Sequence, residues 1–254
     1  MKVSIITVTL NSGATIRNTI ASFLEQTHPD KEMIVIDGAS TDDTLDIVRS
    51  FKSDQIRIVS EADGGPYQAM NKGLALFVGD AAGFLNSDDR FHDRDALARI
   101  AAGLEQADMV YGDLDMIRGR THPVIIRAWR AGRYSRARLK LGWMPPHPTF
   151  YVRRRVVEQV GQFDLSYSTS ADYDFILRAL APEQFSLHYI PHVLIDYELG
   201  GLSSRNLQAT VRGNLKCLRA RRAHLGAGFV DLGLIARPLG KLAQLRRLRG
   251  YYKN

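Results

Sequence analysis

Short apolar runs alternate with segments whose apolar residues recur at helical spacing over the first hundred residues. The runs VSIITVT (3–9), KEMIVID (31–37), QIRIVS (55–60) and AAGFL (81–85) predict strands. The segments 14–26, 40–51 and 67–77 lie between them and predict helices. This alternation predicts an α/β fold with a mostly parallel sheet and helices on both faces.

The start of the second predicted helix carries its own signal. Ser40 and Asp43 have the spacing of a capping box, with Asp where Glu or Gln is usual. We therefore expect this helix to begin beside Ser40.

Polar residues follow each of the four predicted strands. They are Thr9 and Asn11, then Asp37 and Gly38, then Glu61, Asp63, Gly64 and Gly65, and finally Asn86, Ser87, Asp88 and Asp89. Any one of these sets is more often a solvated loop or a helix cap. Because ligands of parallel α/β sheets bind outside the carboxyl ends of the strands, the four sets together predict a binding site.

Asp88 and Asp89 set two like charges side by side at a strand end, which is costly unless something offsets them. Carboxylate oxygens suit Mg²⁺ or Mn²⁺ carrying a diphosphate. The segment TLNSGAT after the first strand has neither spacing of the glycine-rich phosphate loops. ATPase and dehydrogenase functions are therefore disfavoured.

Composition adds the setting. The chain has 254 residues, 45% of them hydrophobic, and one cysteine, Cys217, so no internal disulfide is expected and we predict a cytoplasmic protein. The N-terminus lacks the features of a signal peptide, and no run is long enough to span a membrane. The net charge of +7 is uneven, because Asp231 is the only acid after Arg205 in a segment rich in Lys and Arg.

Five segments carry a family resemblance: SIITVTLN, IVIDGASTDDT, EADGGPYQAMNKGL, GFLNSDD and GQFDLSYSTSADYDFILRAL. In order and spacing the chain resembles the family 2 glycosyltransferases, which have the GT-A fold, over roughly residues 1–200. The resemblance implies an inverting, Mn²⁺- or Mg²⁺-dependent transfer of sugar from a nucleotide diphosphate. Within this family, the chain most resembles the bacterial enzymes that build exopolysaccharide, capsule or lipid-linked oligosaccharides.

The resemblance implies a nucleotide-sugar-binding half, 1–115, and an acceptor-binding half, 116–200. In the first, Asp37 would bind the base, commonly uracil, Thr9 and Asn11 would line its pocket, and Asp63 would close it. Asp89 would bind the metal. Asp88 would lie nearer the ribose or sugar and is a second candidate metal ligand. Lys72 is either a phosphate contact or a solvated helix lysine.

In the second half, the resemblance implies a general base within STSADYDFILRAL. Asp172 is the first choice and Asp174 the alternative, although Ala171 stands where relatives usually have Glu. An arginine-rich segment from Arg127 to Arg155 is either a solvated loop or a wall that accepts phosphate or lipid-diphosphate groups.

Four further residues are acceptor or loop candidates: Trp143, His147, Gly200 and Gly201. A structural role is the alternative for His147, within a proline-rich turn into a strand. Gly200 and Gly201 either end a strand or form a loop that closes over the donor.

Residues 201–254 predict a basic helical tail with leucines at near-helical spacing. We expect it to bind an anionic membrane surface on the inner face of the cell membrane; packing on the domain or homo-oligomerisation is the alternative. The acidic rim argues against nucleic acid as a partner. Two other functions remain open, a sugar-phosphate nucleotidyltransferase and a non-catalytic lipid- or nucleic-acid-binding module.

Overall fold

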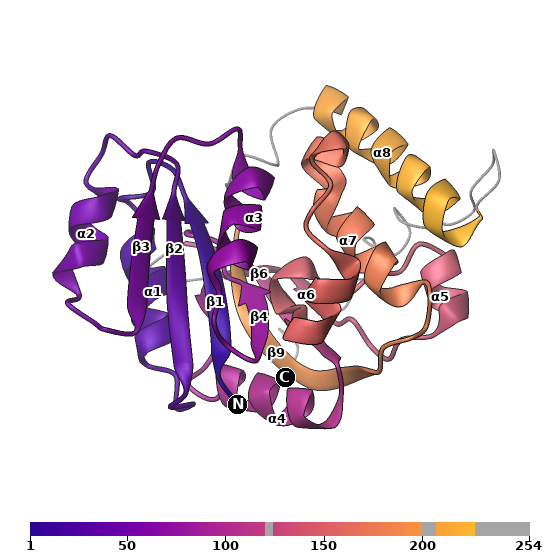
Figure 1. Ribbon diagram of the computed structural model, residues 1–254, viewed down its shortest axis with the longest axis horizontal. Helices are drawn as coiled ribbons and strands as arrows, with labels where there is room; N and C mark the ends of the chain where they lie inside the picture. The colour runs from indigo at the N-terminus through magenta and orange to yellow at the C-terminus, as the bar shows by residue number, and fades with distance from the viewer. Residues whose placement is uncertain (120–123, 200–206, 227–254) are drawn as a thin grey trace.

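The four apolar runs form neighbouring strands of one sheet in the computed structural model, which describes residues 1–119, 124–199 and 207–226 (Figure 1). In the first part of the chain the elements are β1 (Val3–Thr9), α1 (Ile16–Leu24), β2 (Lys31–Asp37), α2 (Thr44–Ser50), β3 (Ile56–Ser60), α3 (Pro66–Leu76), β4 (Ala81–Phe84), β5 (Arg90–Phe91) and α4 (Ala96–Gln106).

The second part supplies the remaining strands and four helices. These elements are β6 (Met109–Arg118), β7 (Val124–Trp129), α5 (Arg136–Lys140), β8 (Tyr151–Arg153), α6 (Arg154–Val160), α7 (Ala171–Leu180), β9 (Leu187–Glu198) and α8 (Leu207–Leu225), with short 3-10 turns at His147–Thr149 and Leu165–Ser170.

The sheet order is β3-β2-β1-β4-β8-β6-β9-β5, with β7 paired to β6. Strands β3, β2, β1 and β4 are parallel, as the sequence predicts. The register sets Thr9 beside Asp37 and Asp37 beside Ser60, so the carboxyl ends of three strands are level. The polar residues that follow these strands therefore meet at one edge of the sheet, here called the rim.

Alternation along the strands divides the core into two layers. In β1, Ile6 packs with α3, α6 and α7, whereas Val3 and Ile5 pack with α1 and α4 on the opposite face. The two faces bury leucine, isoleucine and aromatic side chains from helices that the first figure shows on either side of the sheet. The prediction of helices on both faces is confirmed.

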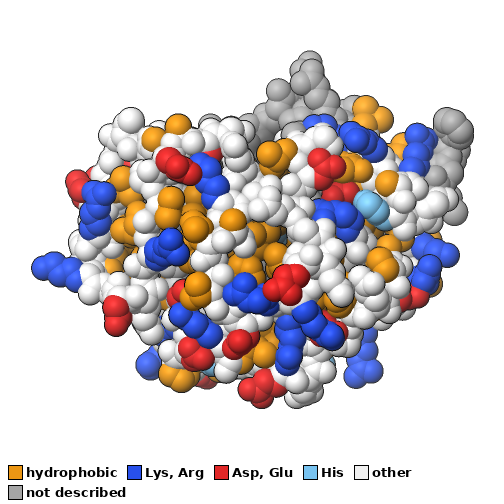
Figure 2. Space-filling model, viewed as in Figure 1, with side chains coloured by type: hydrophobic (Ala, Val, Ile, Leu, Met, Phe, Trp, Pro, Cys, Tyr) orange, Lys and Arg blue, Asp and Glu red, His pale blue; other side chains and the backbone are white. Residues whose placement is uncertain are grey.

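Helix α8 lies along α7 (Figure 1) and contributes Cys217 and Ala220 to the core. Leu215, which the leucine spacing predicted on an apolar face, is 62% exposed. No helix in the described ranges has both the length and the hydropathy to cross a bilayer. On the face seen in Figure 2, acidic and basic side chains are interspersed rather than gathered in one patch.

One local prediction differs from the structure. The capping box is wrong: α2 begins at Thr44, and its N-cap residue Asp43 makes no side-chain capping bond. Ser40 instead donates its hydroxyl to Asp37. Residues 115 and 116, where the donor-binding and acceptor-binding halves were expected to meet, lie within β6, and that division by function stays a prediction.

Candidate active site

Hydrogen bonds join the loops that follow the parallel strands into one rim. The backbone N–H of Asn11, after β1, donates to Oγ of Ser40, after β2, at 2.8 Å. The hydroxyls of Ser12 and Ser87 lie 2.9 Å apart and link the loops after β1 and β4. The sequence prediction that these loops converge is thus met by direct contacts.

Asp37 is the buried centre of this rim, with 0% of its surface exposed. Its carboxylate accepts the Ser40 backbone N–H at 3.0 Å and the hydroxyls of Ser40 and Ser60. Beside it, Thr9 Oγ1 is buried and has no hydrogen-bond partner in the described structure. A buried hydroxyl without a partner is costly, so this atom is a candidate ligand contact.

Asn11 and Asp63 shape the two sides of the rim. Asn11 has a left-handed backbone, with φ of 50°, and its side-chain oxygen accepts the Thr41 N–H at 2.9 Å. Asp63 accepts the N–H of Gly65 at 2.8 Å. A Cβ added at Gly38 would lie 3.0 Å from Oδ2 of Asp63, so a glycine lets the loops after β2 and β3 approach closely.

Lys72 lies on α3 and closes the loop after β3. Its ammonium pairs with Glu61 at 2.9 Å and donates to the carbonyl oxygen of Ala62 at 3.2 Å. The lysine is therefore neither a purely solvated side chain nor one that is free for phosphate in this state.

Asp88 and Asp89 meet the end of β9 at a small cavity. The cavity is lined by Thr15, Asn18, Asp88, Arg90 and Glu198. Asp89 is 1% exposed, and its carboxylate accepts the Asn86 amide at 2.7 Å and the Glu198 backbone N–H at 3.1 Å. Burial and the nearby Glu198 carboxylate raise the pKa of Asp88, and burial and Asp88 raise that of Asp89 well above its usual value.

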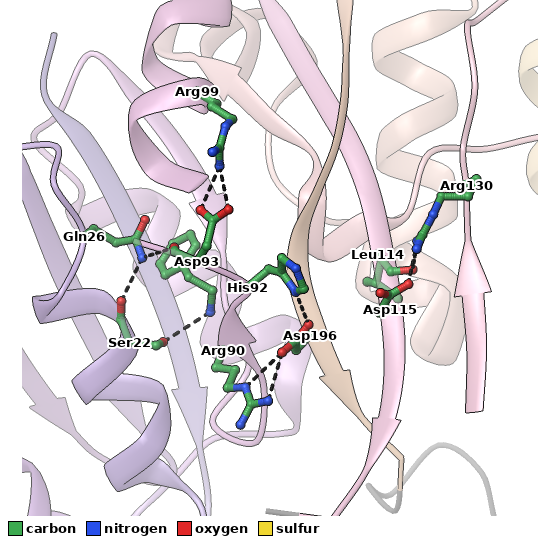
Figure 3. Close-up of polar contacts among 11 residues, drawn as sticks. Ser22, Gln26, Arg90, His92, Asp93, Arg99, Leu114, Asp115, Arg130 and Asp196 are labelled. Carbon is green, nitrogen blue, oxygen red and sulfur yellow. Dashed lines mark hydrogen bonds and ion pairs between the residues drawn. The ribbon is translucent and has the colours of Figure 1, made fainter. Parts of the chain in front are cut away.

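Arg90 fixes this acidic loop against β9. Its guanidinium donates from Nε and Nη2 to Oδ2 of Asp196, both at 3.0 Å, and His92 Nδ1 lies 2.7 Å from Oδ1 of the same carboxylate (Figure 3). Asp196 is 6% exposed, so this network is largely shielded from water. This network therefore holds the Asp88–Asp89 loop rigidly against β9.

Asp172 lies in the first turn of α7, where the helix dipole favours an anion. Its Oδ1 accepts the hydroxyl of Tyr67 at 2.9 Å. Tyr67 is in the first turn of α3, which begins directly after the loop that carries Asp63. The hydrogen bond therefore joins the N-terminus of α7 to the rim.

His147 is half-buried near this acid, with its Nε2 atom shielded from water. Its ring stacks on Phe84 at 5.3 Å, and Nε2 has no partner in the described structure. Burial lowers the pKa of the His147 imidazole, although the Asp172 carboxylate acts in the opposite direction. A neutral imidazole with an unused nitrogen thus borders the Asp172 region.

Asp174 occupies different surroundings from Asp172. It is 1% exposed, and its two oxygens contact Arg178 at 2.8 Å and His224 of α8 at 2.9 Å. Burial raises the pKa of Asp174, but the hydrogen bonds from His224 and Arg178 bring it below its usual value. Asp174 therefore holds α8 on α7 and has no unpaired oxygen for an acceptor.

Trp143 is packed away from the rim contacts. Its indole N–H donates to the Ala131 carbonyl oxygen at 2.8 Å, and its ring contacts those of Tyr111 and Tyr134. The last two candidates, Gly200 and Gly201, lie outside the described residues.

Two residues at the site were not singled out from the sequence. Tyr67 stands inside the motif EADGGPYQAMNKGL, and Glu198 precedes the two glycines after β9. Their positions near glycine-rich turns were the only available signal. Their partners, Asp172 and Asp89, are 105 and 109 residues distant.

Comparison with known proteins gives a consistent family. Residues 4–161 match the model described as glycosyl transferase family 2. A PGL/p-HBAD biosynthesis glycosyltransferase of Mycobacterium tuberculosis is 35% identical over 212 residues, covering 79% of this chain and 78% of the relative. An uncharacterized glycosyltransferase of the same species is 31% identical over 227 residues, covering 84% and 81%.

Solved structures share the fold. Staphylococcus aureus TarS 1–349 in complex with UDP-GlcNAc has a TM-score of 0.65 at 19% identity, covering 88% of this chain and 73% of that one. The mannosyltransferase PcManGT of Pyrobaculum calidifontis, in complex with GDP-Man and Mn²⁺, has a TM-score of 0.65 at 18% identity, covering 96% and 70%. The chain therefore belongs to glycosyl transferase family 2 and is a glycosyltransferase with a GT-A-like α/β fold.

Proposed function

We propose that the protein moves a sugar from a nucleoside diphosphate sugar, with inversion, to a hydroxyl of a glycan or lipid-linked acceptor. The observation that carries the proposal is the 2.9 Å hydrogen bond between Tyr67 and Asp172. It brings a carboxylate of the second half of the chain to the rim formed by the first half. A donor on the rim would then have a base beside its sugar.

The donor we expect is a UDP-sugar bound by Thr9, Asn11, Asp37 and Asp63. A carboxylate offers about four acceptor sites, and protein donors use three of those on Asp37, so one remains for a base N–H. The unpartnered Thr9 hydroxyl would gain a partner from the same ligand. TarS in complex with UDP-GlcNAc supports a uridine donor, whereas PcManGT in complex with GDP-Man is a reason to test guanosine as well.

The acidic loop fits Mg²⁺ or Mn²⁺ in its chemistry. Asp88 and Asp89 present hard oxygen ligands. Burial, and to a lesser degree a neighbouring carboxylate, raises the pKa of each, so a charged pair is disfavoured here unless a cation offsets it. In the described ranges no three His, Cys, Asp or Glu side chains converge as a complete metal site. Two carboxylates suffice when substrate phosphates supply other ligands, as is usual for Mg²⁺. When bound, such a cation would stabilise the charge of the departing diphosphate.

Asp172 is the proposed general base. It would take the proton of the acceptor hydroxyl as that oxygen attacks the anomeric carbon from the face opposite the diphosphate. The new bond joins the acceptor oxygen to the anomeric carbon, and the sugar–phosphate bond breaks, with its electron pair leaving on the nucleoside diphosphate. Single displacement at this carbon inverts its configuration.

For the acceptor, we propose a glycan or lipid-linked molecule of bacterial surface polysaccharide synthesis, met at the inner face of the cell membrane. The support is the excess of Lys and Arg after Arg205 and the biosynthetic name of the mycobacterial relative. Sedimentation of the full chain with anionic and neutral vesicles, at low and high salt, tests the membrane part. Equal pelleting with both lipids would remove it.

Product analysis tests the central proposal. The full chain is incubated separately with UDP-glucose, UDP-N-acetylglucosamine and GDP-mannose, with Mn²⁺ or EDTA, and with water as the acceptor. We expect metal-dependent release of nucleoside diphosphate from one donor, and a loss of roughly 10²-fold or more in Asp172→Asn, the scale of a missing general base. Pyrophosphate release from a nucleoside triphosphate and sugar phosphate would indicate a nucleotidyltransferase, and no turnover with bound UDP would favour a binding module.

A further inference from the structure

Tyr67 contacts one oxygen of Asp172 and leaves the other unused. The phenol hydroxyl donates to Oδ1 at 2.9 Å. Oδ2 receives no hydrogen bond from any residue within the described ranges. A carboxylate that is held through one oxygen has a restricted rotamer, and its second oxygen then points in a defined direction.

The Tyr67 ring is itself held by a cluster of aromatic rings that meet in tilted and edge-to-face contacts. Its centroid is 5.6 Å from that of Phe163, which lies 5.3 Å from Phe84 and 4.9 Å from Phe175. Phe84 ends β4, directly before the loop of Asp88 and Asp89, and Phe175 belongs to α7. This aromatic cluster thus connects the element that carries Asp172 to the strand that precedes the acidic loop.

The hydroxyl of Tyr67 is a dependable donor. Burial, followed by the Asp172 carboxylate, raises the pKa of Tyr67 far above its ordinary value. The phenol therefore keeps its proton throughout the range in which an enzyme would be assayed. Tyr67 cannot act as the base itself, because a phenol that remains protonated cannot take the proton of the acceptor hydroxyl.

We propose that Tyr67 is a positioning residue for the base: its hydroxyl fixes Asp172 through Oδ1 so that Oδ2 receives the proton of the acceptor. This inference rests on the proposed role of Asp172. A purely structural role for the pair predicts lost stability on removing the hydroxyl and an unchanged rate. Positioning predicts a lower kcat with unchanged donor binding.

The experiment compares Tyr67→Phe, Asp172→Asn and the double variant, all in the full chain. Donor hydrolysis is followed by release of nucleoside diphosphate, and UDP binding is measured by calorimetry in the presence of Mn²⁺. Tyr151→Phe is the matched control, because it removes a fully buried hydroxyl that has no partner in the described structure. Thermal unfolding of each variant shows whether it is folded.

We expect Tyr67→Phe to lower kcat about 10-fold or more, the scale of a hydrogen bond to a charged group, with the donor KM and the UDP affinity within about twofold of the wild type. Tyr151→Phe should keep the wild-type kcat. In the Asp172→Asn background, Tyr67→Phe should cause no further loss, because the carboxylate that it positions is absent.

Three results would overturn the inference: a wild-type kcat in Tyr67→Phe, a loss that multiplies with that of Asp172→Asn, or a loss explained by weaker UDP binding. Failure of the proposed base has a different signature. There, Asp172→Asn alone would hydrolyse the donor at the wild-type rate, whatever the result for Tyr67→Phe.

Discussion

The backbone N–H of Glu198 donates a hydrogen bond to Oδ1 of Asp89 across 109 residues of sequence, with an N···O distance of 3.1 Å. This contact ties the acidic loop after β4 to the end of β9. Asp89 is thereby buried among fixed donors, whereas Asp88 lines the adjoining cavity with Glu198. The two neighbouring acids therefore differ in what they can do, although they look alike in the sequence.

Removing either carboxylate should weaken metal-dependent nucleotide binding. We expect Asp88→Asn and Asp89→Asn to weaken UDP binding in Mn²⁺ by about 10- to 100-fold, the scale seen when groups around a metal are lost. In EDTA, both variants should bind UDP as the wild type does. Calorimetry with UDP in both buffers makes the comparison.

Asp93→Asn is the control for this pair. Asp93 follows Asp89 by four residues in the sequence and makes an exposed ion pair with Arg99. It should keep the metal dependence. If Asp88→Asn and Asp89→Asn also kept it, the acidic loop would not be the metal site.

Much of the parallel sheet could be predicted from short-range pattern. The runs that form β1, β2 and β4 are short and apolar. This is the sequence pattern of strands that are buried on both faces of a sheet. The predicted start of α2 was wrong, because the residue types of a capping box also occur in loops. Ser40 is held by Asp37, a contact that the spacing of Ser40 and Asp43 does not reveal.

The site was less accessible to sequence reasoning, since its contacts join distant segments. Asp172 and Asp174 are both in the first turn of α7, and only the packing of α8 shows that Asp174 is paired with His224. In the sequence, Tyr67 is simply one residue of a predicted helix. Its contact with Asp172 becomes visible only from the packing of α3 near α7. Long-range partners decide which of two similar acids is open to a ligand.

A buried phenol offers a test of the core. The hydroxyl of Tyr151 has no partner in the described structure, so burying it brings a cost with no compensating bond. Tyr151→Phe should leave the free energy of unfolding unchanged or raise it by about 1 kcal/mol. Tyr111→Phe, which loses the 2.8 Å bond to the Gly132 carbonyl oxygen, should lower it by about 1 kcal/mol. Urea unfolding measures both, and equal losses in the two variants would contradict the difference in bonding.

His92 should make stability depend on pH. The hydrogen bond with Asp196 raises the pKa of His92 above 6.5, against the effect of burial, and the nearby Asp115 and Asp93 act in the same direction as Asp196. A raised folded-state pKa stabilises the fold fully below pH 6.5, and the contribution is lost as pH rises through the folded-state value.

The test of this dependence uses His92→Gln, which keeps a donor but cannot carry the charge. The wild type should exceed His92→Gln in free energy of unfolding by more at pH 6 than at pH 9. Urea unfolding at the two pH values measures the two differences. A gap of the same size at both would show that the charge of His92 makes no contribution.

The last prediction concerns the docking of α8, which lies within the segment predicted from sequence as a basic helical tail. Arg221 is 2% exposed, and its guanidinium donates to the Leu139 carbonyl oxygen and the Tyr173 hydroxyl, both at 3.0 Å, and to the Lys140 carbonyl oxygen. Arg221→Ala would leave these acceptors buried without their donor and open a cavity beside Ala220. We expect the free energy of unfolding to fall by roughly 2–4 kcal/mol.

Arg222→Ala is the matched control, because the neighbouring side chain is exposed and the change in charge is the same. It should change stability by about 1 kcal/mol or less, because the contacts of an exposed arginine contribute little. Since α7 carries Asp172, loosening α8 should also lower the rate of donor hydrolysis in Arg221→Ala more than in Arg222→Ala. Urea unfolding and nucleoside diphosphate release give the two readouts. If both variants were as stable as the wild type, α8 would be an appendage rather than part of the catalytic domain, and truncation after Gly201 would then leave UDP binding intact.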